Sequence, residues 1–313
     1  MTDLVVADRL EPEDADGTDI ADIADMADVA PTRTPPSRGW VTAKRRRSPR
    51  PVRYLFRFIA VAYLFLLVAW PVSLVAKNTF ANGWSSMRTA LADPLVTSSL
   101  KLTVYVAVVA VIFNLIFGVG ISLILVRRRF PGRRALSALI DLPLAVSPVV
   151  VGLALVLTYN RRDGWLGTTL EDHGFQVLFA NPGIIMATVF VSLPLMIREV
   201  APVLEEIGTD QEQAARSLGA NSRQTFMRIT LPSIKWAVVY GVVLSLARAL
   251  GEFGAVKIVA GNVAGRTQTA TLVVEQTYQD FQQNTAYATS FILAFVAVAC
   301  IVIVSIIRPK GNT

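Results

Sequence analysis

The chain has 313 residues, of which 53% are hydrophobic, and its mean hydropathy is +0.50. A soluble protein of this length does not have so high a hydrophobic content over its whole sequence. The composition therefore predicts a polytopic membrane protein. One cysteine and one histidine exclude a disulfide framework and argue against a thiol metal site or a Ser–His hydrolase. We expect Cys300, inside an apolar run, to be a small buried side chain and His173, in a polar loop, to be solvated.

The overall formal charge of +7 combines two opposite parts. Residues 1–30 hold ten acidic side chains and only Arg9, which gives −9, whereas the rest of the chain has 29 basic and 13 acidic side chains, which gives +16. A basic cluster at 44–57 precedes the first apolar run, where it indicates anionic lipid headgroups rather than nucleic acid. We expect residues 1–50 to be a tail without a secretory signal, its acidic part disordered, with a docking or regulatory role as the alternative.

A membrane-spanning helix needs about 20 consecutive apolar residues. Five uncharged runs of that order, and a sixth that charged residues interrupt, predict six transmembrane helices and an all-α fold. The runs are 58–76, 102–126, 142–160, 175–197, 236–260 (the interrupted one) and 281–307. Because Pro182 lies inside the fourth run, its helix is expected to begin at Gly183. The domain prediction is a first transmembrane helix within 51–80 and a membrane core at 93–307.

Lys and Arg are distributed unequally between the loops on the two sides of these runs. The segments 44–57, 127–134 and 198–235, with the C-terminus, carry 19 of them, against 7 on the other side. Loops rich in Lys and Arg stay in the cytoplasm. The distribution therefore predicts that both termini and the 198–235 loop are cytoplasmic, in a multi-pass inner-membrane protein.

The cytoplasmic loop contains a polar stretch, 205–232, between two apolar runs. Thr209 and Glu212 have the spacing of a capping box, and Gly219 is placed to end the helix that they begin. This local pattern leaves two interpretations open. The stretch is either a helix–turn–helix that meets a partner in the adjoining water or an ordered loop tucked under the bundle.

A second helix is expected to follow directly. Asn221 has the character of an N-cap, with Gln224 three residues further on. The helix carries Phe226 and Met227, and Pro232 is expected to interrupt it.

This stretch resembles the coupling helix of ABC importer permeases, which sits in a groove on the cytoplasmic ATPase subunit. The family signature E-A-A-x3-G-x9-I-x-L-P is matched here by Ala214, Ala215, Gly219, Ile229, Leu231 and Pro232. Its first position falls on Gln213, and the nearest carboxylate, Glu212, is displaced by about 100° of helix rotation. The resemblance implies that these seven signature positions couple the chain to an ATPase.

Two charged residues in the fifth run are candidates for a substrate path. Arg248 and Glu252 are four residues apart and can pair. Ionisable groups at membrane depth face a bundle interior or a water-filled path, so the pair is either a lock between helices or an anion site in which Glu252 holds Arg248 in place. Gly251 and Gly254 would let a neighbour approach the backbone. In the third run, Ser147 lies between two prolines and either offers a hydroxyl to an oxyanion or marks a kinked helix entrance.

Three further stretches narrow the resemblance to oxyanion importers, the sulfate and molybdate permeases: Asp141–Gly152, Leu231–Leu244 and Leu250–Ala255. Together they resemble the W-type permeases of sulfate/thiosulfate importers over residues 55–307, with the paralogous T-type permeases as the alternative. The resemblance implies a type I importer fold, two permease subunits side by side, two ATPase subunits and an extracytoplasmic sulfate-binding protein. It implies no cofactor and no metal.

The sequence contains no P-loop, so ATP must be hydrolysed by another chain. We therefore expect a transporter permease subunit rather than an enzyme. One alternative is a permease for molybdate, tungstate or phosphate. Another is an ion-driven secondary transporter, although the coupling signature and the lack of an obvious inverted repeat oppose it. An intramembrane enzyme would need a nucleophile–base pair or a metal cluster, and the sequence offers neither.

Overall fold

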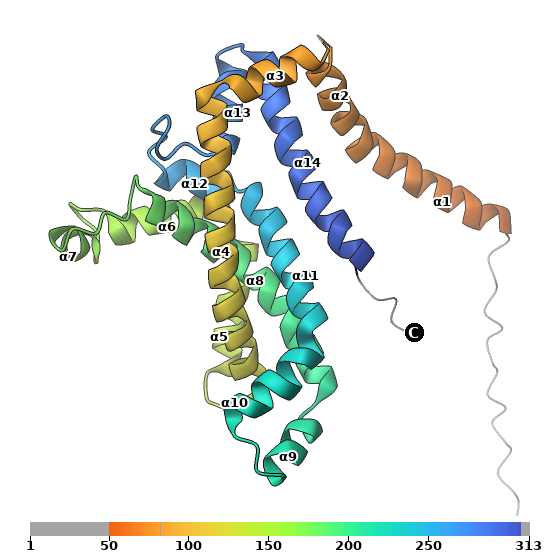
Figure 1. Ribbon diagram of the computed structural model, residues 1–313, viewed down its shortest axis with the longest axis vertical. Coiled ribbons are helices and arrows are strands. Elements are labelled where there is room, and N and C mark those ends of the chain that lie inside the picture. Colours follow the sequence, from red (N-terminus) through yellow and green to blue (C-terminus); the bar gives the residue numbers. More distant parts are fainter. Residues whose placement is uncertain (1–49, 82, 308–313) are drawn as a thin grey trace, which may run out of the picture. The chain divides into compact units, whose positions relative to one another are not determined.

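The computed structural model describes residues 50–81 and 83–307, which form helices and no strand (Figure 1). The chain divides into two units, residues 1–58 and 59–313, and only the start of α1 is described in the first. The acidic and basic tail up to residue 49 lies outside the described residues, as do Arg308 and Lys310. The predictions for both termini therefore stay predictions.

The described residues form long helices and short connecting ones. Two π-helical turns, η2 and η3, interrupt the series. The elements are α1 (Arg50–Leu64), η2 (Phe65–Ala69), α2 (Trp70–Thr79), α3 (Trp84–Ala92), α4 (Pro94–Arg127), α5 (Arg133–Ala145), α6 (Pro148–Tyr159), α7 (Gly167–Asp172), α8 (Asn181–Ile207), α9 (Asp210–Ser217), α10 (Ser222–Thr225), η3 (Phe226–Thr230), α11 (Leu231–Leu250), α12 (Gly254–Val259), α13 (Ala270–Gln279) and α14 (Gln283–Ile307).

Five helical segments are long and apolar enough to cross a membrane, and one bent pair of helices is a sixth candidate. This confirms the all-α, polytopic fold. The five segments are Tyr54–Thr79, Pro94–Arg127, Asn181–Ile207, Ser222–Leu250 and Gln283–Val302. The fourth predicted helix begins at Asn181 rather than Gly183, because Pro182 fits the first turn, where no N–H donor is needed.

Two of the predicted spans are broken, and the break in the third lies at the kinked helix entrance, between Pro143 and Pro148, that the sequence offers. The third is the pair α5 and α6, bent by 113°. Pro148 disfavours helical geometry in the residue before it, and Ser147 accordingly has ψ 135°. The fifth was expected to run to Ala260, but α11 ends at Leu250. A new helix, α12, starts at Gly254. The helix breaks here because Gly251 and Gly254 flank the break and glycine is a weak helix former.

The core of the second unit is the contact between α4, α8 and α11, which run side by side (Figure 1). Met196 of α8 fits a notch made by a glycine on each neighbour. A Cβ added at Gly118 would lie 2.5 Å from Met196 Cγ, and one at Gly241 would lie 2.5 Å from its Sδ. Small residues let helices in a membrane approach this closely, and dispersion then holds them together.

A buried polar contact adds to this packing one turn away from the notch. Asn114 of α4 donates from Nδ2 to Ser192 Oγ of α8 at 2.7 Å, and both residues are fully buried. Ser245 of α11 lies against the same turn, with its Oγ 3.5 Å from Ser192 O. The three helices are therefore tied by hydrogen bonding as well as by close contact.

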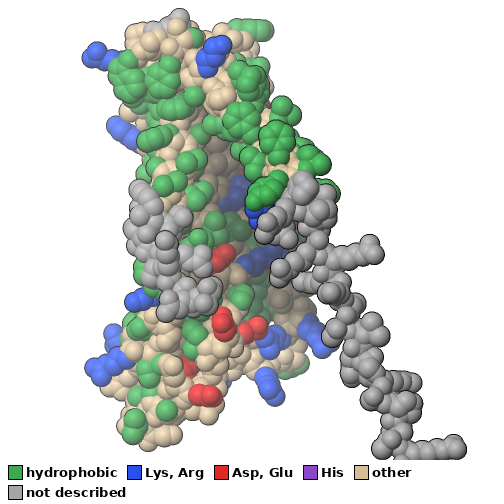
Figure 2. Space-filling model, turned by 90° about the vertical axis from the view of Figure 1, so that its right-hand side faces the viewer, with side chains coloured by type: hydrophobic (Ala, Val, Ile, Leu, Met, Phe, Trp, Pro, Cys, Tyr) green, Lys and Arg blue, Asp and Glu red, His purple; other side chains and the backbone are tan. Residues whose placement is uncertain are grey.

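The two ends of this bundle differ in chemistry. In Figure 1, α9 and α10 lie at the lower end and α3 and α13 at the upper end. On the face shown in Figure 2, hydrophobic side chains dominate the upper half, whereas acidic side chains lie in the middle and lower parts together with several Lys and Arg. The lower end, which carries the polar stretch, is thus the more highly charged one on this face.

The Met196 notch makes a prediction about stability. Gly118→Ala should destabilise the chain by about 1–3 kcal/mol, because the new methyl group overpacks against Met196. Gly120→Ala on the same helix is the matched control, since nothing lies within 4 Å of its Cβ position. It should be neutral or stabilise by up to about 1 kcal/mol through helix propensity. Thermal unfolding of the purified chain in detergent measures both, and equal melting temperatures for the two variants would contradict the close contact.

Candidate functional site

The stretch 205–232 forms α9, a tight turn, α10 and η3 at one end of the bundle (Figure 1). The turn after α9 is a Schellman motif. Gly219, at φ +87°, donates its N–H to Arg216 O at 2.9 Å, and Ala220 N–H donates to Ala215 O at 3.0 Å. The prediction that Gly219 ends the helix is confirmed, because glycine adopts this left-handed conformation without steric cost.

The start of α9 differs from the predicted capping box. The Thr209 side chain caps no backbone N–H of the helix, and its Oγ1 accepts from Gln213 Nε2 at 2.8 Å. Glu212 turns inward instead, where its Oε1 accepts from Arg127 Nε and Nη2 at 3.2 and 3.0 Å and from Thr230 Oγ1 at 2.9 Å. The capping-box prediction is wrong because a charged partner in the bundle binds this carboxylate more strongly than a backbone N–H would.

The sequence analysis did not single out Arg127 or Thr230. Arg127 is the first of three consecutive arginines, and nothing in the local pattern separates it from the other two. In the structure it ends α4 and also donates from Nη1 to Leu204 O of α8 at 3.0 Å. Its side chain retains 15% of its exposure and that of Glu212 retains 10%, so the pair is largely buried.

The second helix begins as predicted but does not stop at Pro232. Asn221 Oδ1 accepts from Gln224 N–H at 2.8 Å, and Gln224 Oε1 accepts from Asn221 N–H at 3.0 Å, which is a complete capping box. The helix then continues through η3 into α11, because Leu231 N–H reaches back five residues to Phe226 O. This wider turn lets Pro232, which has no N–H, sit in the first turn of α11 without breaking the helix.

The signature positions divide into an inward and an outward set. Ala215 is 9% exposed and faces the bundle. Gln213 and Ala214 are exposed, and Leu218 beside them keeps 90% of its surface free. The remaining signature positions lie on the helix that follows: Ile229, Leu231 and Pro232. The outward face of α9 therefore combines polar, charged and apolar groups, since Arg216 is exposed as well, and such a mixture suits contact with a protein surface.

The two helix breaks lie against each other. A Cβ at Gly254, the first residue of α12, would be 3.1 Å from Pro148 Cβ, the first residue of α6. A Cβ at Gly152 of α6 would be 2.9 Å from Ala255 O of α12. These two glycines allow the short helices to pack backbone to backbone, as the sequence predicts for Gly254.

The residues predicted for an anion path lie at this junction. Arg248 Nη1 is 2.7 Å from Glu252 Oε2, an ion pair at the spacing that the sequence predicts, and the two side chains are 35% and 2% exposed. Glu252 Oε1 accepts from Ala255 N–H at 3.1 Å, so this carboxylate also caps α12. Ser147 is exposed at the α5–α6 break. At Gly251 the nearest atom to the Cβ position is Ala247 O of the same helix, at 3.8 Å, so no neighbouring helix approaches closely there, and the approach of a substrate stays a prediction.

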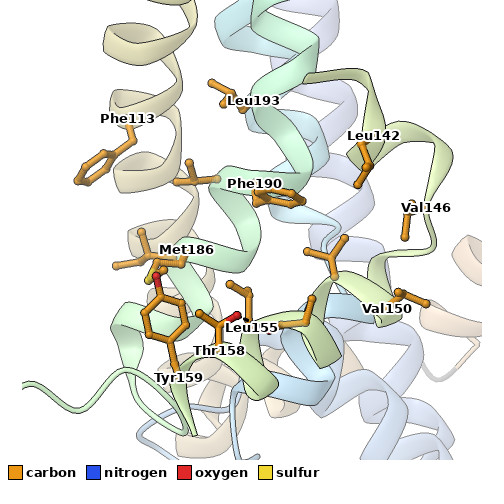
Figure 3. A pocket seen from close by; sticks show the side chains of 14 residues that line it. Phe113, Leu142, Val146, Val150, Leu155, Thr158, Tyr159, Met186, Phe190 and Leu193 are labelled. Carbon is orange, nitrogen blue, oxygen red and sulfur yellow. Dashed lines mark hydrogen bonds between the residues drawn. The ribbon is translucent and has the colours of Figure 1, made fainter. Parts of the chain in front are cut away.

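A separate cavity of about 690 Å³ lies between α4, α5, α6 and α8, with Phe190 in the middle of the lining residues (Figure 3). Its lining is apolar except for the hydroxyl groups of Thr158 and Tyr159. The free-energy cost of burying an unpaired anion among such groups is far larger than the stabilisation that hydrogen bonds from two hydroxyls provide. This cavity is therefore unsuited to an anion, despite its size.

His173 and Cys300 are the remaining residues that the sequence analysis considered. His173 is exposed, as predicted, with Nδ1 2.7 Å from Thr169 O. Cys300 is half-buried rather than buried within this chain, because it lies on a helix with open faces. Within residues 50–81 and 83–307, no three His, Cys, Asp or Glu side chains are grouped so that they could hold a metal ion.

Residues 115–309 match the model of the family described as the inner membrane component of binding-protein-dependent transport systems. The chain belongs to this family. It is a multi-pass permease subunit of a transport system, as the sequence predicts, and not an enzyme.

Several relatives of this permease carry specific names. It is 44% identical over 252 residues, 80% of this chain and 88% of the relative, to the sulfate transport system permease protein CysW of Synechococcus elongatus. It is 38% identical over 273 residues, 86% of this chain and 93% of the relative, to the protein of the same name in Escherichia coli K12. It is 37% identical over 234 residues, 75% and 84% of the two chains, to the permease protein CysT of Salmonella typhimurium.

A solved structure shows the same fold. This permease matches a chain of a bacterial ABC transporter involved in the import of the acidic polysaccharide alginate, with a TM-score of 0.70 at 16% identity, over 84% of this chain and 96% of the other. At this identity the likeness concerns the fold alone. It confirms the predicted architecture of an ABC importer permease.

Proposed function

We propose that the chain is the W-type permease of an ATP-driven sulfate/thiosulfate importer and forms half of the substrate path. The observation that carries this proposal is the coupling signature, folded as an exposed helix at one end of the bundle, in a chain whose relatives are named sulfate permeases. Its partners are then a paralogous T-type permease, two ATPase subunits and a sulfate-binding protein that delivers the anion from outside.

The outward face of α9 is the surface proposed to meet the ATPase. Gln213, Ala214 and Leu218 lie there, and Leu218 is almost fully solvent-exposed in this chain. An apolar side chain that is exposed at the end of a polar helix is typical of a residue that fills a pocket on a partner. ATP-driven closure of the ATPases would displace α9, and the bundle would switch the side to which its central path opens.

The proposed orientation places α9 and α10 in the cytoplasm. It is supported by the excess of Lys and Arg on the same side of the spans, in the segments 44–57, 127–134 and 198–235. The N- and C-termini are cytoplasmic in this arrangement, and the upper end with α3 and α13 meets the binding protein.

The proposed anion path passes the junction of the two helix breaks. A sulfate dianion needs positive charge and hydrogen-bond donors in place of water. Arg248 supplies a guanidinium whose side chain is about one-third exposed. The buried carboxylate of Glu252 pairs with this guanidinium and fixes its position. Ser147 adds an exposed hydroxyl beside Pro148, which in turn contacts Gly254.

The nearest alternative is a permease for molybdate, tungstate or phosphate, since these anions offer similar charge and acceptors. Competition of each with labelled sulfate in uptake by the reconstituted complex separates them. An ion-driven secondary transporter is the second alternative, and uptake that persists without the ATPase subunits would favour it.

Coupling through α9 predicts the effect of a proline in its terminal turn. Gly219→Pro removes the N–H bond to Arg216 O and cannot adopt φ +87°, so it distorts the turn that ends α9. The assembled complex should still hydrolyse ATP, while sulfate uptake falls by about tenfold or more. The measurement is labelled sulfate uptake and phosphate release in proteoliposomes.

The control for that variant is Gly174→Pro, which places the same substitution at φ +80° in the turn after α7, where Gly174 N–H donates to Glu171 O at 2.9 Å, away from α9 (Figure 1). It should retain uptake within about twofold if the effect belongs to the coupling helix rather than to local strain. Undiminished sulfate uptake in Gly219→Pro would contradict the coupling role.

The anion role of Arg248 predicts different results for two variants that both lack the ion pair. Glu252→Gln keeps the oxygen that accepts from Ala255 N–H and leaves Arg248 charged, so sulfate uptake should stay within about threefold of the wild type. The double variant Arg248→Ala/Glu252→Gln removes the cation and should lower uptake by about tenfold or more. Assembly of the complex is measured alongside. Equal loss of uptake, or loss of assembly, in both variants would show that the pair only locks the fold.

A further inference from the structure

Four separate elements meet at the ion pair between Arg127 and Glu212. Arg127 is the last residue of α4, Glu212 belongs to α9, Thr230 ends η3, and Leu204 lies in the last turn of α8. Arg127 donates to Glu212 Oε1 from two nitrogens, at 3.0 and 3.2 Å, and to Leu204 O at 3.0 Å. Thr230 Oγ1 donates to the same carboxylate oxygen at 2.9 Å. We name these four residues the α9 hub.

The α9 hub differs from the other ion pairs at this end of the bundle by its burial. The side chains of Arg133 and Glu205 are 43% and 59% exposed, and those of Arg198 and Asp141 are 56% and 47% exposed. Exposed pairs of this kind contribute little to any fixed geometry, because water competes for both partners. A fork of charge-assisted bonds that is mostly shielded from water fixes the position of α9 far more strictly.

The position of the carboxylate along α9 makes the hub possible. Glu212 is 8% exposed and points into the bundle, whereas its neighbour Gln213 is exposed and donates to Thr209. One residue changes the direction of a side chain by about 100°, so a carboxylate at 213 could not reach Arg127. The carboxylate of Glu212 is therefore used inside the chain and is not offered to a partner.

The hub also lies on the route by which a displacement of α9 would reach the long helices of the bundle. The α9 helix joins the chain through Gly208, at φ +70°, on one side and the Gly219 turn, at φ +87°, on the other. A push on α9 alone could be absorbed at these two turns. The hub bypasses them, because it connects α9 directly to the ends of α4 and α8 and to the start of α11 through η3.

We propose that Arg127 and Glu212, with Thr230, are positioning residues that make α4, α8 and α11 follow α9 as one body. This inference rests on the proposed coupling of α9 to an ATPase. The contacts of the hub lie within the chain, between the four elements that it joins. It sets how much of the displacement of α9 reaches the junction near Arg248, and hence how many anions move for each ATP hydrolysed.

The test measures that ratio in the complete complex, reconstituted in proteoliposomes with its paired permease, ATPase subunits and sulfate-binding protein. Glu212→Gln keeps the shape of the side chain and its acceptor oxygen but removes the charge that holds the Arg127 fork. Sulfate transported per ATP should fall about fivefold or more, while basal ATP hydrolysis stays near the wild-type level. Thr230→Val removes one donor isosterically and should lower the ratio by about twofold to threefold.

The matched control is Glu205→Gln, which removes the exposed pair with Arg133 and should leave the ratio unchanged. A purely structural role would lower the yield or melting temperature of the complex without changing sulfate per ATP in the complexes that form. A wild-type ratio in Glu212→Gln would overturn the hub. If Glu212→Gln does not assemble, Thr230→Val decides, and a wild-type ratio there would overturn it equally. Absence of ATP-dependent uptake in the wild-type complex would instead overturn the proposed function, and the hub with it.

Discussion

A helix that stops inside a membrane leaves N–H and C=O groups that lipid cannot satisfy, so a break at that depth must be covered by protein. Within the described residues, two breaks fall inside the predicted spans, after Ala145 and after Leu250. They are packed against each other through Gly152 and Gly254, and Glu252 caps the helix that restarts the chain. This arrangement brings Glu252, its partner Arg248 and the two glycines to one junction, which is the place that we propose for the anion path.

Close packing of three helices connects this junction to the far end of the bundle. Because α4, α8 and α11 are locked around Met196 by glycine contacts, they cannot slide past one another without opening a gap. The contact between Arg127 and Glu212 attaches α9 to this body. A displacement at one end of the bundle is therefore available at the other as a movement of packed helices, which is how small shifts are amplified in close-packed proteins.

Local chemistry made most of the helices, the Gly219 turn and the Asn221 cap predictable from the sequence, since apolar runs and cap spacing act within a few residues. The break after Leu250 was missed because the run was treated as one helix in spite of its charged residues; Gly251 and Gly254, which flank Glu252, were the available signal. The contact of Arg127 with Glu212 joins residues 85 apart and depends on how α4 and α9 pack. No local pattern contains that information, so this part of the site needed the structure.

The account depends on α9 facing the cytoplasm and touching a separate ATPase there. The most direct measurement labels a single cysteine, Leu218→Cys in a Cys300→Ser background, with a membrane-impermeant maleimide; Leu218 is 90% exposed, and Cys300 is the only native cysteine. The account predicts labelling in inverted membrane vesicles but not in intact cells, and protection when the ATPase subunits are bound. Labelling from outside intact cells, or labelling that bound ATPase leaves unchanged, would contradict it.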